Sequence, residues 1–153
     1  GYRAVLSMDA LSVSITLRSR QSQDGEETHL EQRMAGTLSA TRNGWQLQYR
    51  EPPGEGGETC LTLEQGRALL ERGGPLETQM CFQPGAVHPA RYQTLYGALE
   101  LSVETDYLGW ELSHSGGRVM IRYRLSAQEQ LLGAYTLQLR VRTVQAPPAD
   151  EQK

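Results

Sequence analysis

Six arginines recur at alternating positions in three stretches of the chain, one near the N-terminus and two near the C-terminus. They are Arg18, Arg20, Arg122, Arg124, Arg140 and Arg142. A guanidinium group donates paired hydrogen bonds to carboxylate or phosphate, so arginines gathered on one surface suit an anion, an RNA or an acidic protein partner. This chemistry requires the three stretches to be neighbouring strands, with the first strand beside the last.

The same arginines also fit a purely structural role. Acidic residues follow one another along a stretch that could neighbour them: Glu100, Glu104, Asp106 and Glu111. Carboxylates on an adjoining strand would pair with arginines in a cross-strand ladder. The formal charge of −3 at pH 7 and the scarcity of outward aromatic side chains favour this ladder and make nucleic acid an improbable partner. Both roles stay open at this point.

A second set of residues suits the interior of a barrel. The inward register of the expected strands carries a mixture of aliphatic, thioether and aromatic side chains: Met34, Trp45, Tyr49, Met80, Phe82, Leu101, Tyr123 and Tyr135. A small barrel either fills its interior with side chains or keeps room for one small ligand. These residues are therefore the expected wall for a small, partly apolar or amphipathic ligand, with the segments 52–57 and 84–89 as its mouth. A packed core is the alternative.

Motifs for catalysis or metal binding are missing from the sequence. His29, His88 and His114 are far apart and stand at no ligand spacing with Cys60 or Cys81. No serine or cysteine lies in a nucleophile motif. We therefore expect no catalytic residues, no metal and no cofactor, and predict a protein that is not an enzyme.

Length and composition set the frame for these sites. A chain of 153 residues with 38% hydrophobic residues suits one folded domain. Two cysteines are too few for a disulfide-stapled secreted scaffold, and no apolar stretch reaches the roughly 18 residues of a membrane span. The expected location is the cytoplasm, with no membrane partner.

The dominant pattern along the chain is alternation of apolar and polar residues, which is typical of strands with one buried face. In the stretch from Tyr96 to Leu108, for example, the pattern predicts that Leu101, Val103 and Tyr107 share the inward face. Asn43-Gly44 predicts a tight hairpin turn, and the short segment 67–72 between two glycine turns predicts a strand rather than a helix.

These strands predict an all-β fold. Eight to ten strands joined by short turns are typical of a single antiparallel up-and-down β-barrel, whose closure removes exposed strand edges. The barrel is expected to span residues 8–145. Residues 1–7 are expected to be an added or flexible N-terminal segment, and the polar residues 146–153 a disordered tail.

Several short motifs carry a resemblance to a known family. They are Arg72-Gly73, Met80-x-Phe82, Gly85, Tyr92-x-Thr94-x-Tyr96-Gly97-x-Leu99-x-Leu101, Thr105, Gly117 and Tyr123-x-Leu125. With these motifs the chain resembles the YwiB-like family of small bacterial proteins, over roughly Met8 to Val144. The resemblance implies a calycin fold, meaning a lipocalin-like antiparallel barrel. It implies no biochemical function and no functional residues, and the Pro-Gly-rich segment 52–57 departs from the family pattern.

Two functions follow as hypotheses. The first is a non-enzymatic protein that binds a small, partly apolar ligand inside the barrel. The alternative is an interaction module with a solid core, which uses the outer arginine face to bind a protein partner or to form a homodimer.

Overall fold

The computed structural model describes residues 10–51, 57–74 and 76–144, and these residues form ten β-strands. The strands are β1 (Leu11–Gln23), β2 (Glu26–Ala40), β3 (Gly44–Arg50), β4 (Glu58–Glu64), β5 (Arg67–Arg72), β6 (Glu77–Phe82), β7 (Val87–Thr94), β8 (Gly97–Ser113), β9 (Gly116–Ala127) and β10 (Gln130–Thr143). The predicted segments 1–7 and 146–153 and most of the loop 52–57 lie outside the described residues.

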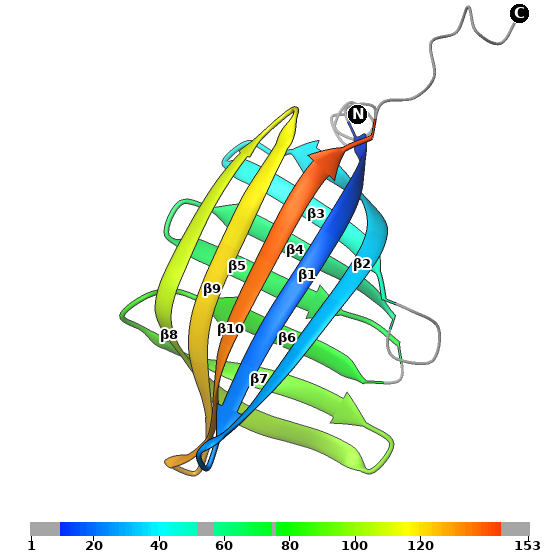
Figure 1. Cartoon of the computed structure of the whole chain (residues 1–153). Coiled ribbons are helices and arrows are strands. Elements are labelled where there is room, and N and C mark those ends of the chain that lie inside the picture. The colour runs from blue at the N-terminus through cyan, green and yellow to red at the C-terminus, as the bar shows by residue number, and fades with distance from the viewer. Residues whose placement is uncertain (1–9, 52–56, 75, 145–153) are drawn as a thin grey trace, which may run out of the picture.

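The ten strands close into one antiparallel barrel (Figure 1). Each strand pairs with its neighbours in sequence, and β1 pairs with β10 to complete the circle. The predicted all-β, single up-and-down barrel is confirmed, at the upper limit of the expected strand number. The strand predicted over 67–72 is also confirmed, as β5.

The barrel has two unlike walls. Five long strands, β1, β2, β8, β9 and β10, form the front wall in Figure 1, and the short strands β3 to β7 cross behind them. The two walls meet only partly at β2. Its residues Gly36–Ala40 pair with β3, whereas its earlier residues pair only with β1 among the described residues. The barrel is therefore less completely closed along the first half of β2.

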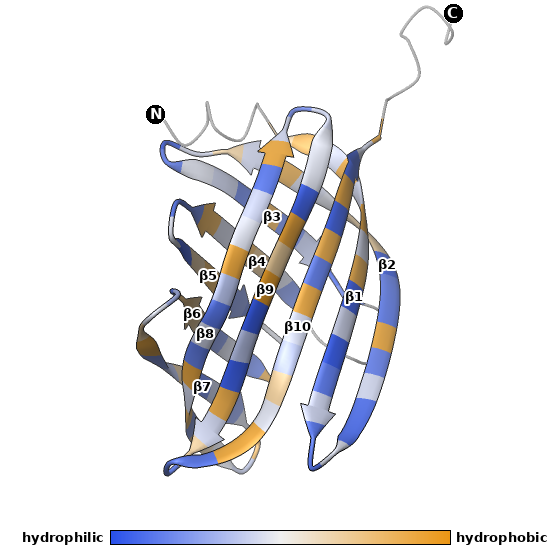
Figure 2. Ribbon diagram, turned by 60° about the vertical axis from the view of Figure 1, so that its left-hand side comes forward, coloured by the Kyte–Doolittle hydropathy of each residue, from blue (hydrophilic) through white to orange (hydrophobic). Residues whose placement is uncertain are grey.

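Alternation of side chains places the apolar set inside. Figure 2 shows hydrophobic and hydrophilic residues alternating along β1, β8, β9 and β10. On β1, for instance, Val13, Ile15 and Leu17 are buried while Ser14 and Arg18 are not. Burial of such one-sided apolar faces is the main force that stabilises the closed sheet. The core extends over all ten strands.

The predicted interior residues do point inward. Met34, Tyr49, Met80, Phe82 and Leu101 are buried in the core. Trp45, Tyr123 and Tyr135 are partly buried and pack against it.

Three local predictions were wrong. β2 and β3 do form a hairpin, but Asn43-Gly44 is not its two-residue turn, because Gly44 already belongs to β3 and neither residue has a positive φ angle. A β-bulge on β8 between Thr105 and Tyr107 shifts the register, so Tyr107 points outward and is 42% exposed. The inward register resumes after the bulge at Leu108 and Trp110, which pair with the buried Ile121 and Val119. The segment 84–89 is not wholly a loop, because β7 begins at Val87.

Candidate functional site

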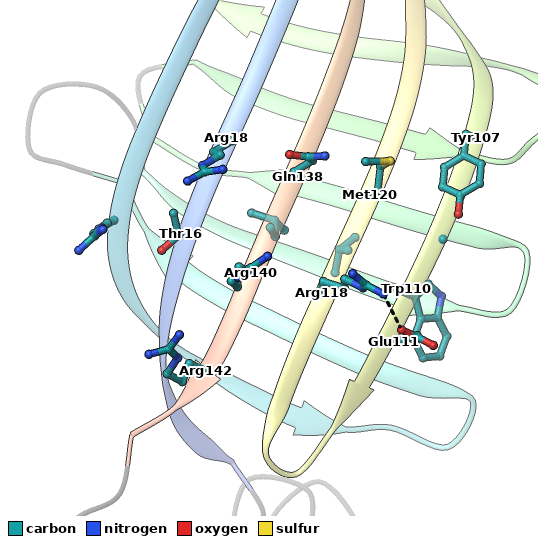
Figure 3. A pocket seen from close by; sticks show the side chains of 14 residues that line it. Thr16, Arg18, Tyr107, Trp110, Glu111, Arg118, Met120, Gln138, Arg140 and Arg142 are labelled. Carbon is teal, nitrogen blue, oxygen red and sulfur yellow. Dashed lines mark hydrogen bonds and ion pairs between the residues drawn. The ribbon is translucent and has the colours of Figure 1, made fainter.

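A groove of about 820 Å³ lies on the outer face of the long-strand wall (Figure 3). It crosses β1, β2, β8, β9 and β10, and five arginines contribute to it against one glutamate. The polar and charged lining residues are Thr16, Arg18, Arg33, Tyr107, Glu111, Arg118, Gln138, Arg140 and Arg142. Its volume lies in the range of small-molecule sites.

The groove is organised by cross-strand register. One row of outward side chains runs Arg33, Thr16, Arg140, Arg118 and Glu111, each directly opposite the next. Residues directly opposite each other in an antiparallel pair have their Cβ atoms about 5 Å apart. The register therefore places Arg118 and Arg140 side by side, a like-charge pair that is unfavourable in itself. Glu111, on the other side of Arg118, offsets part of this charge.

A second row runs parallel to the first. It contains Arg18, Gln138, Met120 and Gly109, and Figure 3 shows the first three side chains in line across the wall, with Tyr107 beyond them. Gly109 has no side chain, and a Cβ atom there would meet the hydroxyl group of Tyr107 at 2.5 Å. The tyrosine ring therefore lies over Gly109 and forms an end of the groove.

Carboxylates neutralise only part of this positive surface. Arg18 Nε donates to Glu31 Oε1 at 2.9 Å, and Arg118 contacts Glu111 at 3.4 Å. Arg33, Arg140 and Arg142 have no ion-pair partner among the described residues. The middle of the groove therefore presents unpaired guanidinium groups.

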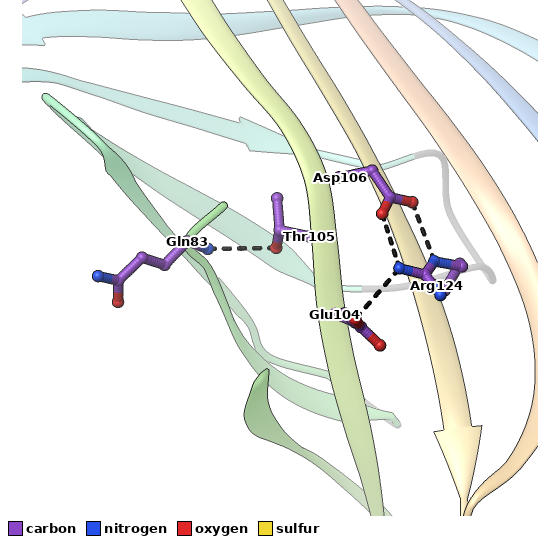
Figure 4. A network of polar contacts seen from close by, with 5 residues as sticks. All are labelled: Gln83, Glu104, Thr105, Asp106 and Arg124. Atoms are coloured by element: carbon purple, nitrogen blue, oxygen red, sulfur yellow. Dashed lines mark hydrogen bonds and ion pairs between the residues drawn. The ribbon is translucent and has the colours of Figure 1, made fainter. Parts of the chain in front are cut away.

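Outside the groove, the predicted ladder exists. Arg124 donates to both oxygens of Asp106, at 2.8 and 3.0 Å, and contacts Glu104 at 3.2 Å (Figure 4). The hydrogen bond to Asp106, followed by the charges of the two carboxylates, raises the pKa of Arg124. Arg122 lies over the ring of Tyr107, 4.9 Å from its centroid.

The six predicted arginines thus divide between the two roles. Arg18, Arg140 and Arg142 line the groove, Arg122 and Arg124 have intramolecular partners, and Arg20 lies opposite Thr136. The first strand does neighbour the last, although in register Arg18 faces Gln138 and Arg140 faces Thr16.

Of the four predicted carboxylates, Glu104, Asp106 and Glu111 pair with arginines, while Glu100 has no ion pair among the described residues. Sequence reasoning missed Arg33 and Arg118 as members of the groove. Their outward position in the same alternating pattern was the available signal.

Inside the barrel, three of the predicted aromatic residues form one cluster, while the ring of Trp45 contacts His114 instead. The rings of Tyr123 and Tyr135 stack with centroids 5.1 Å apart, and Phe82 packs on Tyr123 at 4.8 Å. Gln21 donates to the hydroxyl group of Tyr135 at 3.2 Å. The first pocket lies on the outer face of the barrel, and the second is lined by outward residues such as Cys60 and Gln79 together with Arg72 and Thr78 of the inward register.

The two cysteines are free and lie on the outward register of β4 and β6. Burial raises the pKa of both thiols, so each is protonated at neutral pH and a poor nucleophile. Cys60 lines the second pocket, where Glu58, Glu71 and Arg91 mix both charges.

Among the described residues, no three His, Cys, Asp or Glu side chains gather in a way that could hold a metal ion. The same part of the chain contains no helix long and apolar enough to cross a membrane.

The fold and the groove together define a class of protein: a closed ten-stranded antiparallel barrel with an arginine-lined outer wall. The chain belongs to the family described as a domain of unknown function, DUF1934, which matches residues 15–139. This assignment confirms the family resemblance seen in the sequence motifs.

Two comparisons place the chain beside a protein of the same fold. It is 26% identical over 119 residues to the uncharacterised β-barrel protein YwiB of Bacillus subtilis (strain 168), covering 77% of this chain and 84% of that protein. The crystal structure of the ywiB protein from Bacillus subtilis matches with a TM-score of 0.84 and 22% identity, over 95% of this chain and 100% of that chain. At this identity the structural likeness shows the barrel fold alone.

Proposed function

We propose that this protein is a non-enzymatic interaction module whose outer groove binds an acidic segment of a partner protein. The observation that carries the proposal is the pair Arg118 and Arg140, which lie directly opposite each other in the groove. Arg118 contacts Glu111 on its other side, whereas Arg33, Arg140 and Arg142 have no carboxylate partner among the described residues. An acidic segment would remove the like-charge repulsion and satisfy several guanidinium donors together.

Carboxylates are the favoured partner because the protein already uses them on this wall. Glu31 and Glu111 pair with arginines at the two sides of the groove, and Asp106 pairs with Arg124 nearby. An extended acidic segment would extend the same pairing to the centre of the groove. Charge complementarity of this kind mainly sets the association rate and the choice of partner.

A second copy of the chain is a poor occupant of the groove. In a twofold symmetric dimer the same patch lies on both sides of the interface. Arg118 and Arg140 would then approach their own counterparts, which adds like-charge repulsion. The sequence left two partners open for an interaction module, a second copy of the chain or another protein. We therefore propose another protein as the partner.

Nucleic acid is disfavoured by the aromatic residues of the groove. Base stacking needs an accessible aromatic face. Arg122 covers the ring of Tyr107, and Trp110 points inward, with its Nε1 donating to the carbonyl oxygen of Glu64 at 3.1 Å. The groove thus offers charge without a stacking platform.

Replacing Arg140 by glutamine is expected to weaken the binding of a decaglutamate peptide about tenfold, because a charge-assisted hydrogen bond to a carboxylate is lost. Arg118→Gln should act similarly. Calorimetric titration at low and high salt measures the effect, and salt should weaken binding to the unmodified protein.

Arg91→Gln is the matched control, since Arg91 is an exposed arginine on the opposite wall and lines only the second pocket. Equal losses for Arg91→Gln and Arg140→Gln would refute the groove as the site. Tighter binding of single-stranded decathymidylate than of decaglutamate would refute an acidic protein segment as its occupant.

Binding of a small ligand inside the barrel is the second candidate function. The observation that favours it is an inward-facing arginine, Arg72, among tyrosines of the predicted interior wall. Cytoplasmic location remains a proposal that accompanies both functions, and the free, protonated thiols support it.

A further inference from the structure

A row of polar side chains crosses the interior of the short-strand wall. Tyr49, Thr59, Arg72, Thr78 and Tyr92 lie opposite one another on β3, β4, β5, β6 and β7. All five occupy the inward register, which elsewhere on these strands carries core residues. A polar belt of this kind inside a barrel needs partners for its hydrogen-bonding groups, because burying them unpaired is costly.

Arg72 stands at the centre of this interior row. Its inward neighbours on β5, Ala68 and Leu70, are core residues, and the arginine side chain itself is only 27% exposed. One terminal nitrogen, Nη2, contacts Glu51 Oε2 at 3.0 Å, and Glu51 is 10% exposed. This ion pair compensates the buried charge, so the guanidinium can be held inside the barrel.

Several donors of the interior row remain unsatisfied. Arg72 Nε and Thr59 Oγ1 are buried without a hydrogen-bond partner. The hydroxyl groups of Tyr49, in the same row, and of Tyr123, on β9, make no hydrogen bond to the described residues, although they are not among the fully buried unpaired atoms. Unpaired donors around one guanidinium match a ligand group that accepts several hydrogen bonds and carries negative charge.

The tyrosines are suited to donate. Burial raises the pKa of Tyr49, Tyr92 and Tyr123, and the charge of Arg72 acts on each of them in the opposite direction. Their hydroxyl groups are therefore neutral at physiological pH. They remain hydrogen-bond donors to an anion and add no competing negative charge.

The row continues toward an apolar end of the barrel. Leu99 lies opposite Tyr92 and is 52% exposed, whereas Leu101, the next inward residue on β8, is 8% exposed. The exposed fraction changes in the same way on β2, where Met34 is 8% exposed and Leu30 is 50% exposed. Exposed leucines on the inward register leave apolar surface for a hydrocarbon chain to cover.

We propose that the barrel interior binds a small molecule with one carboxylate and an apolar chain, the carboxylate accepting hydrogen bonds from Arg72, Thr59, Tyr49 and Tyr123. Arg72 then bridges the ligand and Glu51, and the chain extends past Tyr92 toward Leu99. This inference rests on the second candidate function, binding inside the barrel, and specifies the headgroup that the interior selects.

The test compares decanoate with decanol, which has the same chain and no charge. Decanoate should bind at least about tenfold more tightly than decanol, because its hydrogen bonds are charge-assisted. Thr59→Val and Tyr123→Phe should each reduce this preference about fivefold, since each removes a hydroxyl group with little change of shape. Both can be measured by calorimetric titration.

Matched controls separate the interior from the outer face of the barrel. Thr136→Val and Arg20→Gln remove a hydroxyl group and a charge from the outer face, at two opposite positions of β10 and β1 that do not line the groove. Both should leave the preference unchanged. Arg72→Met should abolish the preference for decanoate. This variant leaves Glu51 buried without its ion-pair partner and can unfold the barrel, so the test relies on Thr59→Val and Tyr123→Phe.

The outcomes are distinct. If decanoate and decanol bind equally, and Leu99→Trp blocks the interior and abolishes the binding of both, the carboxylate inference is overturned. Binding inside the barrel would then still stand. Absence of binding by either compound would overturn both. A preference that falls with Arg140→Gln but not with Thr59→Val would place the carboxylate on the outer wall and overturn the interior site.

Discussion

Phe82→Ala is expected to lower the free energy of unfolding by about 3–5 kcal/mol, the range for removing a large aromatic side chain from a core. Phe82 is fully buried, lies opposite Ala68 on β5 and packs its ring 4.8 Å from that of Tyr123. The variant loses buried apolar surface and leaves a cavity between the two walls. Equilibrium unfolding in urea measures the change.

Leu131→Ala is the control for this variant, because Leu131 is 58% exposed on β10. It should cost less than about 1 kcal/mol. If Phe82→Ala were as mild as Leu131→Ala, Phe82 would not occupy the core in solution, and the inward alternation of β6 would be wrong.

Gly116→Ala is expected to destabilise the barrel by at least about 3 kcal/mol, through backbone strain and overlap together. Gly116 begins β9 with a φ angle of +112°, and a Cβ atom there would collide with the carbonyl oxygen of Val141 on β10. The overlap is with a backbone atom, which cannot move away by changing rotamer as a side chain can. Thermal unfolding followed by circular dichroism measures the loss.

Gly25 provides the comparison that separates strain from collision. It has a φ angle of +81°, and a Cβ atom would meet nothing within 4 Å. Gly25→Ala should therefore cost only about 1 kcal/mol, from the backbone conformation alone. Similar losses at both positions would mean that β9 and β10 do not approach as closely as the structure shows.

The class of fold was predictable because alternation of apolar and polar residues repeats in almost every strand. Strands joined in sequence by short turns, such as Asp24-Gly25, leave few topologies other than a meander. The pairing of the first and last strands follows once the meander closes.

The outer groove could be predicted only in part. Outward arginines are visible as alternate positions, but which of them face each other depends on the register between strands. The placement of Arg118 opposite Arg140 and of Arg33 opposite Thr16 follows from hairpin registers that the sequence does not specify uniquely.

The bulge on β8 illustrates a second limit. One extra residue between Thr105 and Tyr107 turns the later part of the strand over, so Tyr107 joins the outer wall. Thr105 stays inside, where it accepts a hydrogen bond from the backbone N–H of Gln83 at 3.2 Å (Figure 4). The alternation on each side of the bulge is regular, and a bulge of one residue leaves no composition signal.

Arg72 was missed for a different reason. An arginine next to a glycine turn is ordinarily exposed. Its burial depends on Glu51, which comes from another part of the chain and lies within 3.0 Å only in the folded barrel. The polar row through the interior is therefore a property of the assembled sheet.

The most direct test of the proposed function is to observe the arginine side chains while an acidic peptide binds. In ¹H–¹⁵N spectra of the Nε–H groups, decaglutamate should shift the signals of Arg33, Arg118, Arg140 and Arg142 along one saturating binding curve. The signals of Arg67 and Arg91, on the opposite wall, should stay in place. Equal shifts of all arginines, or shifts confined to Arg67 and Arg91, would contradict the groove as the binding site.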